Sequence, residues 1–157
     1  MPETEITAEP GTSQVVVSRE FDAPRDLVFR CFTDPDLIPR WLGPRELTTR
    51  VEEYDLKDGG RYRYVHVDAE GNEYAFRGVF HGDPAPELTV QTFEFEGMPG
   101  HVALEAVTMT ESGGRTRVRT LSSFQSVEDR DGIIASGMEV GVRDSDERLA
   151  ELLTELR

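Results

Sequence analysis

One stretch restricts the folds open to this chain more than any other, because residues 126–157 predict a single long C-terminal helix. Ser126 is a favourable N-cap, and Asp129 follows three residues later, as in a capping box. Apolar and small residues then recur at steps of three and four: Ile134, Met138, Gly141, Val142, Ser145, Leu149, Leu152, Leu153 and Leu156. This spacing makes one helix face that must rest on another element. At 1.5 Å per residue the helix would be roughly 40 Å long, more than a small core needs.

The middle of that helix face is unusual because its residues are small, namely Ala135, Ser136, Gly137, Gly141 and Ser145. A glycine inside a helix costs about 1 kcal/mol relative to alanine, so two glycines need a reason. Two explanations stay open. The helix approaches a sheet closely, or it leaves room for a ligand between itself and the sheet.

The sheet itself is predicted from short segments separated by turn residues, which is typical of antiparallel strands. The expected strands cover residues 15–21, 47–56, 61–67, 74–81, 88–95, 102–110 and 115–124. Two short helices follow the first strand, beginning at Asp22-Ala23-Pro24 and after Thr33-Asp34-Pro35. The order of elements indicates an α+β fold with the helices on one face of the sheet.

The hairpin around Gly71 gives a more detailed expectation. Pairing in register about that glycine places these residues opposite each other on one face: Tyr64 and Gly78, Tyr62 and Phe80, His66 and Phe76. The other face carries three arginines, so the aromatic face is expected to be interior. Buried tyrosine and histidine need hydrogen-bond partners. Either they belong to a core and bond to backbone or water, or they line a cavity that binds something amphipathic.

Length and charge exclude several classes of protein. The 157 residues suit one domain with a sizeable core. The net charge of −14 argues against nucleic acid or an anionic membrane as a partner, and no apolar run is long enough to span a membrane. The single cysteine, Cys31, allows no intramolecular disulfide. We expect a cytoplasmic protein with a disordered acidic tail over residues 1–13 and one domain over residues 14–157.

No strong catalytic signature is present. The sequence lacks a phosphate-binding loop, a dinucleotide fingerprint and a paired-histidine zinc helix, so neither cofactor nor metal is expected. Cys31 lies on an apolar helix face, which indicates packing. Glu94 and Glu105 are expected to be exposed on their strands, with buried acids of raised pKa as the alternative.

Several motifs together resemble the START-like, helix-grip superfamily (SRPBCC, polyketide cyclase/START-like). They are Phe21-Asp22-Ala23-Pro24, Thr33-Asp34-Pro35, Trp41-Leu42-Gly43-Pro44, Gly59-Gly60-Arg61-Tyr62, Gly78-Val79-Phe80, Thr92-Phe93, Gly137-Met138-Glu139 and residues 148–153. Within that superfamily the chain is most similar to homologues of the activator of the 90-kDa heat-shock-protein ATPase. The family often has Gly-Trp where this chain has Gly141-Val142, and a bulky apolar residue where Asp146 stands. We therefore expect a pocket that differs from those of relatives.

The resemblance implies a curved antiparallel sheet wrapped around the C-terminal helix, with two short helices after the first strand. It also implies that a small hydrophobic or amphipathic molecule binds in a cavity between sheet and helix. The residues expected around that cavity are Trp41, Tyr62, Tyr64, His66, Phe76, Phe80, Met138, Gly141 and Val142.

Two other functions remain open at this point. One is a cyclase-, aromatase- or hydrolase-like enzyme that uses Tyr62, Tyr64 or His66 as general acid or base. The other is a protein that contacts a chaperone in the way of the founding activator. Chaperone contact is not favoured, because it needs an exposed apolar patch and the outer face of the central hairpin carries arginines. Relatives are often dimers, which leaves a homodimer open, although no interface can be recognised in the sequence.

Overall fold

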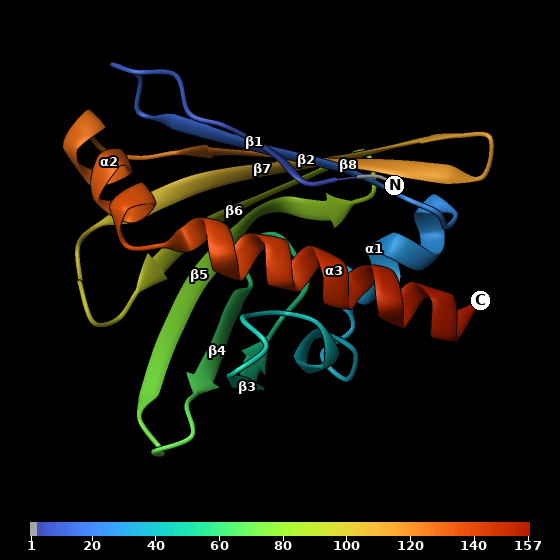
Figure 1. Cartoon of the computed structure of the whole chain (residues 1–157), viewed down its shortest axis with the longest axis horizontal. Helices are drawn as coiled ribbons and strands as arrows, with labels where there is room; N and C mark the ends of the chain where they lie inside the picture. The colour runs from blue at the N-terminus through green and yellow to red at the C-terminus, as the bar shows by residue number, and fades with distance from the viewer. Residues whose placement is uncertain (1–2) are drawn as a thin grey trace.

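The structure is a computed structural model that describes residues 3–157, and it consists of one curved antiparallel sheet and a long C-terminal helix (Figure 1). The eight strands lie in the order β1-β2-β8-β7-β6-β5-β4-β3. Their bounds are β1 Glu5–Thr7, β2 Gln14–Phe21, β3 Thr48–Tyr54, β4 Arg61–Val67, β5 Glu73–Ala85, β6 Leu88–Phe95, β7 Val102–Ser112 and β8 Arg115–Ser123. The helices are α1 Arg25–Thr33, the 3-10 helix η1 Ile38–Arg40, α2 Val127–Ala135 and α3 Met138–Leu156.

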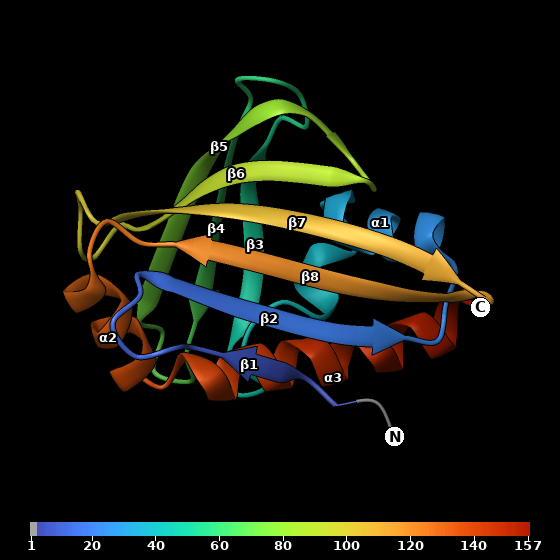
Figure 2. The same cartoon turned by 90° about the horizontal axis from the view of Figure 1, so that it is seen from above.

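Strands β3 to β8 form a meander in which each strand pairs with the next along the chain, and β2 pairs with β8. Viewed from above, β3 and β4 cross β2, β7 and β8 at a steep angle, so the sheet is strongly twisted, and α3 lies along its concave side (Figure 2). The predicted α+β helix-grip fold is confirmed. The expected bounds of β4 and β6 are the observed ones, and β5 continues to Ala85, through a predicted turn, with a register irregularity after His81.

The register of the β4–β5 hairpin differs from the prediction by two residues. The observed pairs are Tyr62 with Gly78, Tyr64 with Phe76 and His66 with Tyr74. The turn is responsible, because the carboxylate of Asp68 accepts hydrogen bonds from the backbone N–H groups of Glu70 and Asn72 at 3.0 and 2.9 Å. Since side chains alternate with a period of two, a shift of two residues leaves every side chain on its predicted face.

The predicted single C-terminal helix is in fact two helices, α2 and α3. Ser126 caps α2 as expected, accepting a hydrogen bond from the Asp129 N–H at 3.0 Å. The helix then ends at Ala135, and Gly137 takes a left-handed φ of 88° before α3 begins. A residue with a Cβ rarely adopts this conformation, so Gly137 serves the break between the helices.

The tail expected to be disordered contains β1, which pairs with β2 at the edge of the sheet. The buried guanidinium of Arg130 donates hydrogen bonds to the carbonyl groups of Glu9 and Gln14 at 2.8 and 3.1 Å. The Thr4 hydroxyl donates to Asp146 at 2.7 Å. Residues 3–13 are therefore held against both α2 and α3, and the expectation for residues 1–2 lies outside the described part of the chain.

The hydrophobic core occupies one end of the molecule, where α1, η1 and the last turns of α3 pack on the sheet. Its members are Phe21, Ala23, Val28, Cys31, Leu37, Trp41, Val107, Met109, Val118, Leu149, Leu152 and Leu153. The Trp41 indole donates a hydrogen bond to the Cys31 carbonyl at 2.9 Å. Burial raises the pKa of the Cys31 thiol, which fits the predicted packing role.

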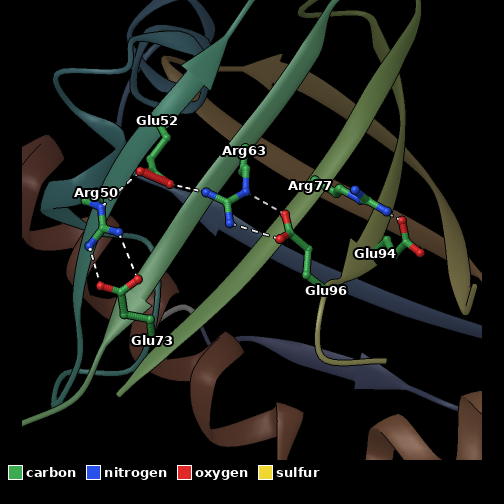
Figure 3. A network of polar contacts seen from close by, with 7 residues as sticks. All are labelled: Arg50, Glu52, Arg63, Glu73, Arg77, Glu94 and Glu96. Carbon is green, nitrogen blue, oxygen red and sulfur yellow. Dashed lines mark hydrogen bonds and ion pairs between the residues drawn. The ribbon is translucent and has the colours of Figure 1, made fainter. Parts of the chain in front are cut away.

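The outer face of the central strands carries ion pairs (Figure 3). Arg63 lies between Glu52 and Glu96 and contacts the Glu96 carboxylate at 2.6 and 3.0 Å. Arg77 pairs with Glu94 at 3.0 Å. Solvent-exposed pairs of this kind contribute less than about 1 kcal/mol each, so their main effect is to make this face charged rather than apolar.

Candidate functional site: a cavity between the sheet and the C-terminal helix

A cavity of about 790 Å³ lies between the concave face of the sheet and α3. Small-molecule sites typically enclose about 300–1,000 Å³, so this volume suits a ligand of moderate size. All nine residues predicted for the cavity line it: Trp41, Tyr62, Tyr64, His66, Phe76, Phe80, Met138, Gly141 and Val142. That they contact a ligand stays a prediction.

The N-terminal half of α3 leaves space at Gly141 and Ser145, the two small residues among those that line the cavity. A Cβ at Gly141 would meet Pro44 at 3.5 Å, an ordinary contact distance, and no other neighbouring side chain within 4 Å. Close approach of the helix therefore does not require this glycine. Ser145 is different, because its hydroxyl accepts a hydrogen bond from the Gly43 N–H at 2.8 Å in a buried contact. Of the two explanations for the small residues, space for a ligand fits Gly141. Close approach of the helix to the loop at Gly43 explains Ser145.

Aromatic rings form one wall of the cavity. The Phe76 ring lies 5.4 Å from the Tyr64 ring, 5.3 Å from Phe93 and 5.1 Å from Phe95, measured between centroids. The Tyr62 hydroxyl donates to the Thr92 carbonyl at 2.5 Å, so this polar group is satisfied by backbone. Burial raises the pKa of both Tyr62 and Tyr64 far above the ordinary value, and both phenols are neutral.

His66 is held in one orientation by the neighbouring strand β3. The Thr49 hydroxyl donates to the Leu42 carbonyl at 2.8 Å and lies 2.8 Å from the His66 Nδ1 atom. Because the hydroxyl has one proton, Nδ1 donates to it, and Nε2 of the neutral ring carries the lone pair. Burial, with a smaller effect of the Arg148 charge, lowers the pKa of His66 to about 4. The imidazole is therefore neutral at physiological pH.

Glu105 is a cavity residue that the sequence analysis placed wrongly on the exposed side of its strand. Its carboxylate accepts hydrogen bonds from the Gln91 amide at 3.1 Å and the Ser122 hydroxyl at 3.2 Å. Burial raises the pKa of Glu105, and these two hydrogen bonds partly offset the rise. Alternation could have revealed the placement, because the buried Ala103 and Val107 lie at the same parity on β7. Glu94 lies on the outer face, where it pairs with Arg77, but only 14% of its side chain is exposed, less than predicted.

A second polar region lies where β2 faces α3. Arg19 lines the cavity between Val17 and Phe21, and its guanidinium carbon is 5.0 Å from the centroid of the Phe21 ring. Asp146 also lines the cavity. Burial raises the pKa of Asp146, while the hydrogen bond from Thr4 and the charge of Arg19 act in the opposite direction. Arg19 was not among the residues predicted for the cavity, although alternation along β2 puts it on the same face as Val17.

Residues 3–157 contain no group of three or more His, Cys, Asp or Glu side chains arranged to hold a metal ion. Within the same residues, no helix is both long enough and apolar enough to cross a membrane.

An antiparallel sheet curved around a long C-terminal helix defines the START-like, helix-grip class of protein. Within this class, the family model described as "Activator of Hsp90 ATPase homolog 1-like protein" matches residues 22–154. The chain therefore belongs to that family. Comparison with curated proteins gives no match.

Solved structures of bacterial proteins share this fold. A Rhodobacter sphaeroides protein aligns with a TM-score of 0.89 at 22% identity, covering 98% of this chain and 99% of that one. A Mycobacterium smegmatis protein aligns with a TM-score of 0.87 at 23% identity, covering 97% of each chain. A protein from Arthrobacter aurescens aligns with a TM-score of 0.88 at 25% identity, covering 96% of this chain and 91% of that one. These likenesses concern the fold.

Proposed function

We propose that this protein binds a small apolar or amphipathic molecule in the cavity between the sheet and α3. The observation that carries the proposal is the composition of the cavity, whose 790 Å³ is lined mainly by aromatic and aliphatic side chains. A few polar groups, among them His66, Glu105 and Arg19, stand at separate points of that lining. Apolar walls with a few fixed polar groups are typical of sites that hold and orient a ligand.

The arrangement supports binding more directly than catalysis. The Tyr62 hydroxyl is already engaged with the backbone of Thr92, and the neutral His66 is oriented by Thr49. The one hydroxyl bonded to His66, that of Thr49, donates its proton to the Leu42 carbonyl and accepts from Nδ1, so His66 does not act on it as a base, as an activated nucleophile would require.

A Gly141→Leu variant tests the binding proposal. Leucine at this position would project into the cavity, and leucine is also the better helix former, so the variant should be at least as stable as the wild type. Val140→Leu is the matched control, because Val140 is adjacent and 60% exposed. The probe is N-phenyl-1-naphthylamine, a neutral dye that fluoresces in apolar surroundings.

We expect the wild type and Val140→Leu to bind the dye with the same Kd, and Gly141→Leu to bind it at least about tenfold more weakly, which corresponds to about 1.4 kcal/mol. Equal binding by Gly141→Leu would show that the dye does not occupy this cavity. Failure of the wild type to bind any apolar probe would contradict the proposal as a whole.

A second candidate function is catalysis with Glu105 as general acid. The specific observation in its favour is a buried carboxyl group of raised pKa that is positioned by Gln91 and Ser122 in the same cavity. Mass spectrometry of the small molecules released from wild type and from Glu105→Gln separates the two functions. The same molecule in both preparations supports binding alone. A chemically related but different molecule in the variant supports turnover.

Chaperone contact, which the family name suggests, is not our proposal. The outer face of the central strands carries the ion pairs of Arg50, Arg63 and Arg77 (Figure 3). A surface of this kind offers no contiguous apolar area for a protein partner.

A further inference from the structure

We propose that the ligand is an amphipathic anion whose acidic group binds the guanidinium of Arg19, while its apolar part occupies the cavity. This inference rests on the proposed binding function and adds the chemical class and orientation of the ligand.

Arg19 extends from the inner face of β2 into the apolar part of the site. Val17 and Phe21, the residues at the same parity on this strand, both line the cavity with it. The guanidinium lies over the Phe21 ring, a cation–π contact that steers its plane but offers no hydrogen-bond acceptor. The side chain is therefore partly buried and reaches the apolar lining of the cavity.

The guanidinium has no acceptor among residues 3–157. None of their carboxylates lies within 4.0 Å of its nitrogen atoms, and its Nε atom is buried without a hydrogen-bond partner. The buried Arg130 shows the contrast, because it donates to two backbone carbonyls and to Asp131. A buried N–H group without an acceptor, such as Nε of this partly buried side chain, is unfavourable. A carboxylate, sulfonate or phosphate would supply the missing acceptors, and the fork of donors on arginine matches such a group in two parallel hydrogen bonds.

Asp146 lies near Arg19, and its negative charge would repel an anionic ligand. Its carboxylate accepts the Thr4 hydroxyl at 2.7 Å instead of pairing with Arg19. One turn before Asp146 on α3, Arg143 donates a hydrogen bond to the Thr4 carbonyl and pairs with Glu139. Asp146 is thus committed to Thr4 and leaves the donors of Arg19 unused. Removing its charge should strengthen anion binding.

The second buried acid, Glu105, lies far from Arg19. On β2, Val15 is opposite Ser122, which contacts Glu105, and Arg19 lies four residues further along the strand. Ideal strand rise and spacing place Arg19 and Glu105 roughly 16 Å apart. A ligand anion at Arg19 therefore avoids the Glu105 carboxyl group, and apolar residues such as Val17 and Val107 line the space between them.

Two dyes with the same ring system test the inference. 8-Anilino-1-naphthalenesulfonate carries a sulfonate that the neutral N-phenyl-1-naphthylamine lacks. The protein as a whole has a charge of −14 and repels anions, so any preference for the sulfonate must come from a local site. We expect the wild type to bind the sulfonate dye at least about tenfold more tightly than the neutral dye, with Arg19 providing that preference.

The variants are Arg19→Met, Arg19→Gln and Asp146→Asn, with Arg119→Met as the control. Arg119 is an exposed arginine of β8 on the outer face, so the control removes the same charge without altering the cavity. Both Arg19 variants should lose the preference for the sulfonate while their affinity for the neutral dye changes less than about twofold. Asp146→Asn should strengthen sulfonate binding, and Arg119→Met should change neither. Thermal unfolding checks that each variant is folded.

Each other outcome has a definite meaning. Equal binding of both dyes by the wild type, or a preference that survives in both Arg19 variants, overturns the inference and leaves the binding function standing. Binding of neither dye by the wild type overturns the binding function and the inference together. If only Asp146→Asn folds, unchanged sulfonate binding in that variant overturns the inference.

Discussion

Gly78 shows how one missing side chain permits the aromatic wall. A Cβ at this position would collide with the Tyr62 ring and with the Thr92 carbonyl, the two groups that share a hydrogen bond. The backbone of Thr92 cannot move without disturbing the β5–β6 pairing. Glycine at position 78 therefore serves close packing, and its φ is not in the left-handed region.

We expect Gly78→Ala to lower the free energy of unfolding by about 1–3 kcal/mol, because overpacking forces backbone and ring to shift. Urea denaturation measures the change. Gly132→Ala is the control, since a Cβ there meets no neighbour within 4 Å and the residue lies within α2. That control should gain up to about 1 kcal/mol from helix propensity. A Gly78→Ala protein as stable as the wild type would contradict the packing described for Tyr62.

His66 makes stability depend on pH in a predictable direction. Its pKa is lowered to about 4 in the folded protein, against about 6.5 in an unfolded chain. The unfolded state therefore binds more protons between these values, and stability falls as the pH decreases below about 6.5. Other acids with raised pKa, such as Glu105, act in the opposite direction, so a comparison with a variant is needed.

We expect the wild type to lose about 2 kcal/mol more than His66→Gln between pH 7.5 and pH 5, as measured by denaturation at each pH. Glutamine keeps a hydrogen-bonding group near Thr49 but does not titrate. The same pH dependence in both proteins would show that His66 is not desolvated in the folded state.

At the scale of whole elements, Arg130 joins three parts of the chain. Its side chain projects from α2 and bonds to the carbonyl groups of Glu9 and Gln14 and to the Thr12 hydroxyl. The apolar character of α2 is weak, and two of its apolar residues, Val127 and Ile134, are exposed. The position of α2 on the sheet therefore depends on polar contacts more than on hydrophobic packing.

Arg130→Met should lower the free energy of unfolding by about 2–3 kcal/mol, because buried carbonyl groups lose their donors. Hydrogen exchange followed by mass spectrometry should become faster in residues 5–14 and in α2, while the core near Leu149 stays protected. Arg119→Met serves as the control for charge loss. Unchanged exchange in residues 5–14 would mean that β1 is held by its pairing with β2 alone.

The elements that sequence reasoning recovered are those with a repeating pattern. Alternation and turn residues gave the strands β2 to β8, and the three- and four-residue spacing gave the core face of α3. The break at Gly137 was missed because Ile134 and Met138 continue that spacing across it. The three residues of β1 were missed because a short edge strand is held by backbone pairing and leaves no apolar pattern.

The residues of the cavity that were predicted from the sequence are also those that follow a repeating pattern. The faces of β4 and β5 follow from alternation, which survives a register error of two residues. Arg19 and Glu105 were missed because a charged residue on a strand is normally assigned to the solvent side. Alternation along β2 and β7 nevertheless directs both side chains into the cavity. Charged residues in such inward positions are expected at functional sites.

At the scale of the whole molecule, the core and the cavity adjoin each other. The core packs around α1, η1 and the Leu149–Leu153 part of α3, and some of its members, such as Trp41 and Met109, also line the cavity, which extends to Gly141 toward the other end of α3. The exposed surface carries charge, and the cavity has few charged groups: Arg19 lies near Asp146, and Glu105 lies apart from Arg19. A ligand that binds only the folded state would add to stability. We therefore expect the folded protein to be further stabilised by its ligand.

The measurement that tests this central claim most directly is native mass spectrometry of wild type and Gly141→Leu, purified without detergent and measured before and after incubation with 8-anilino-1-naphthalenesulfonate. We expect the wild type to carry one small-molecule adduct that is lost on denaturation, and Gly141→Leu to carry none. A wild type that shows only its bare mass under both conditions, or an adduct that persists unchanged in Gly141→Leu, would contradict binding in the cavity between the sheet and α3.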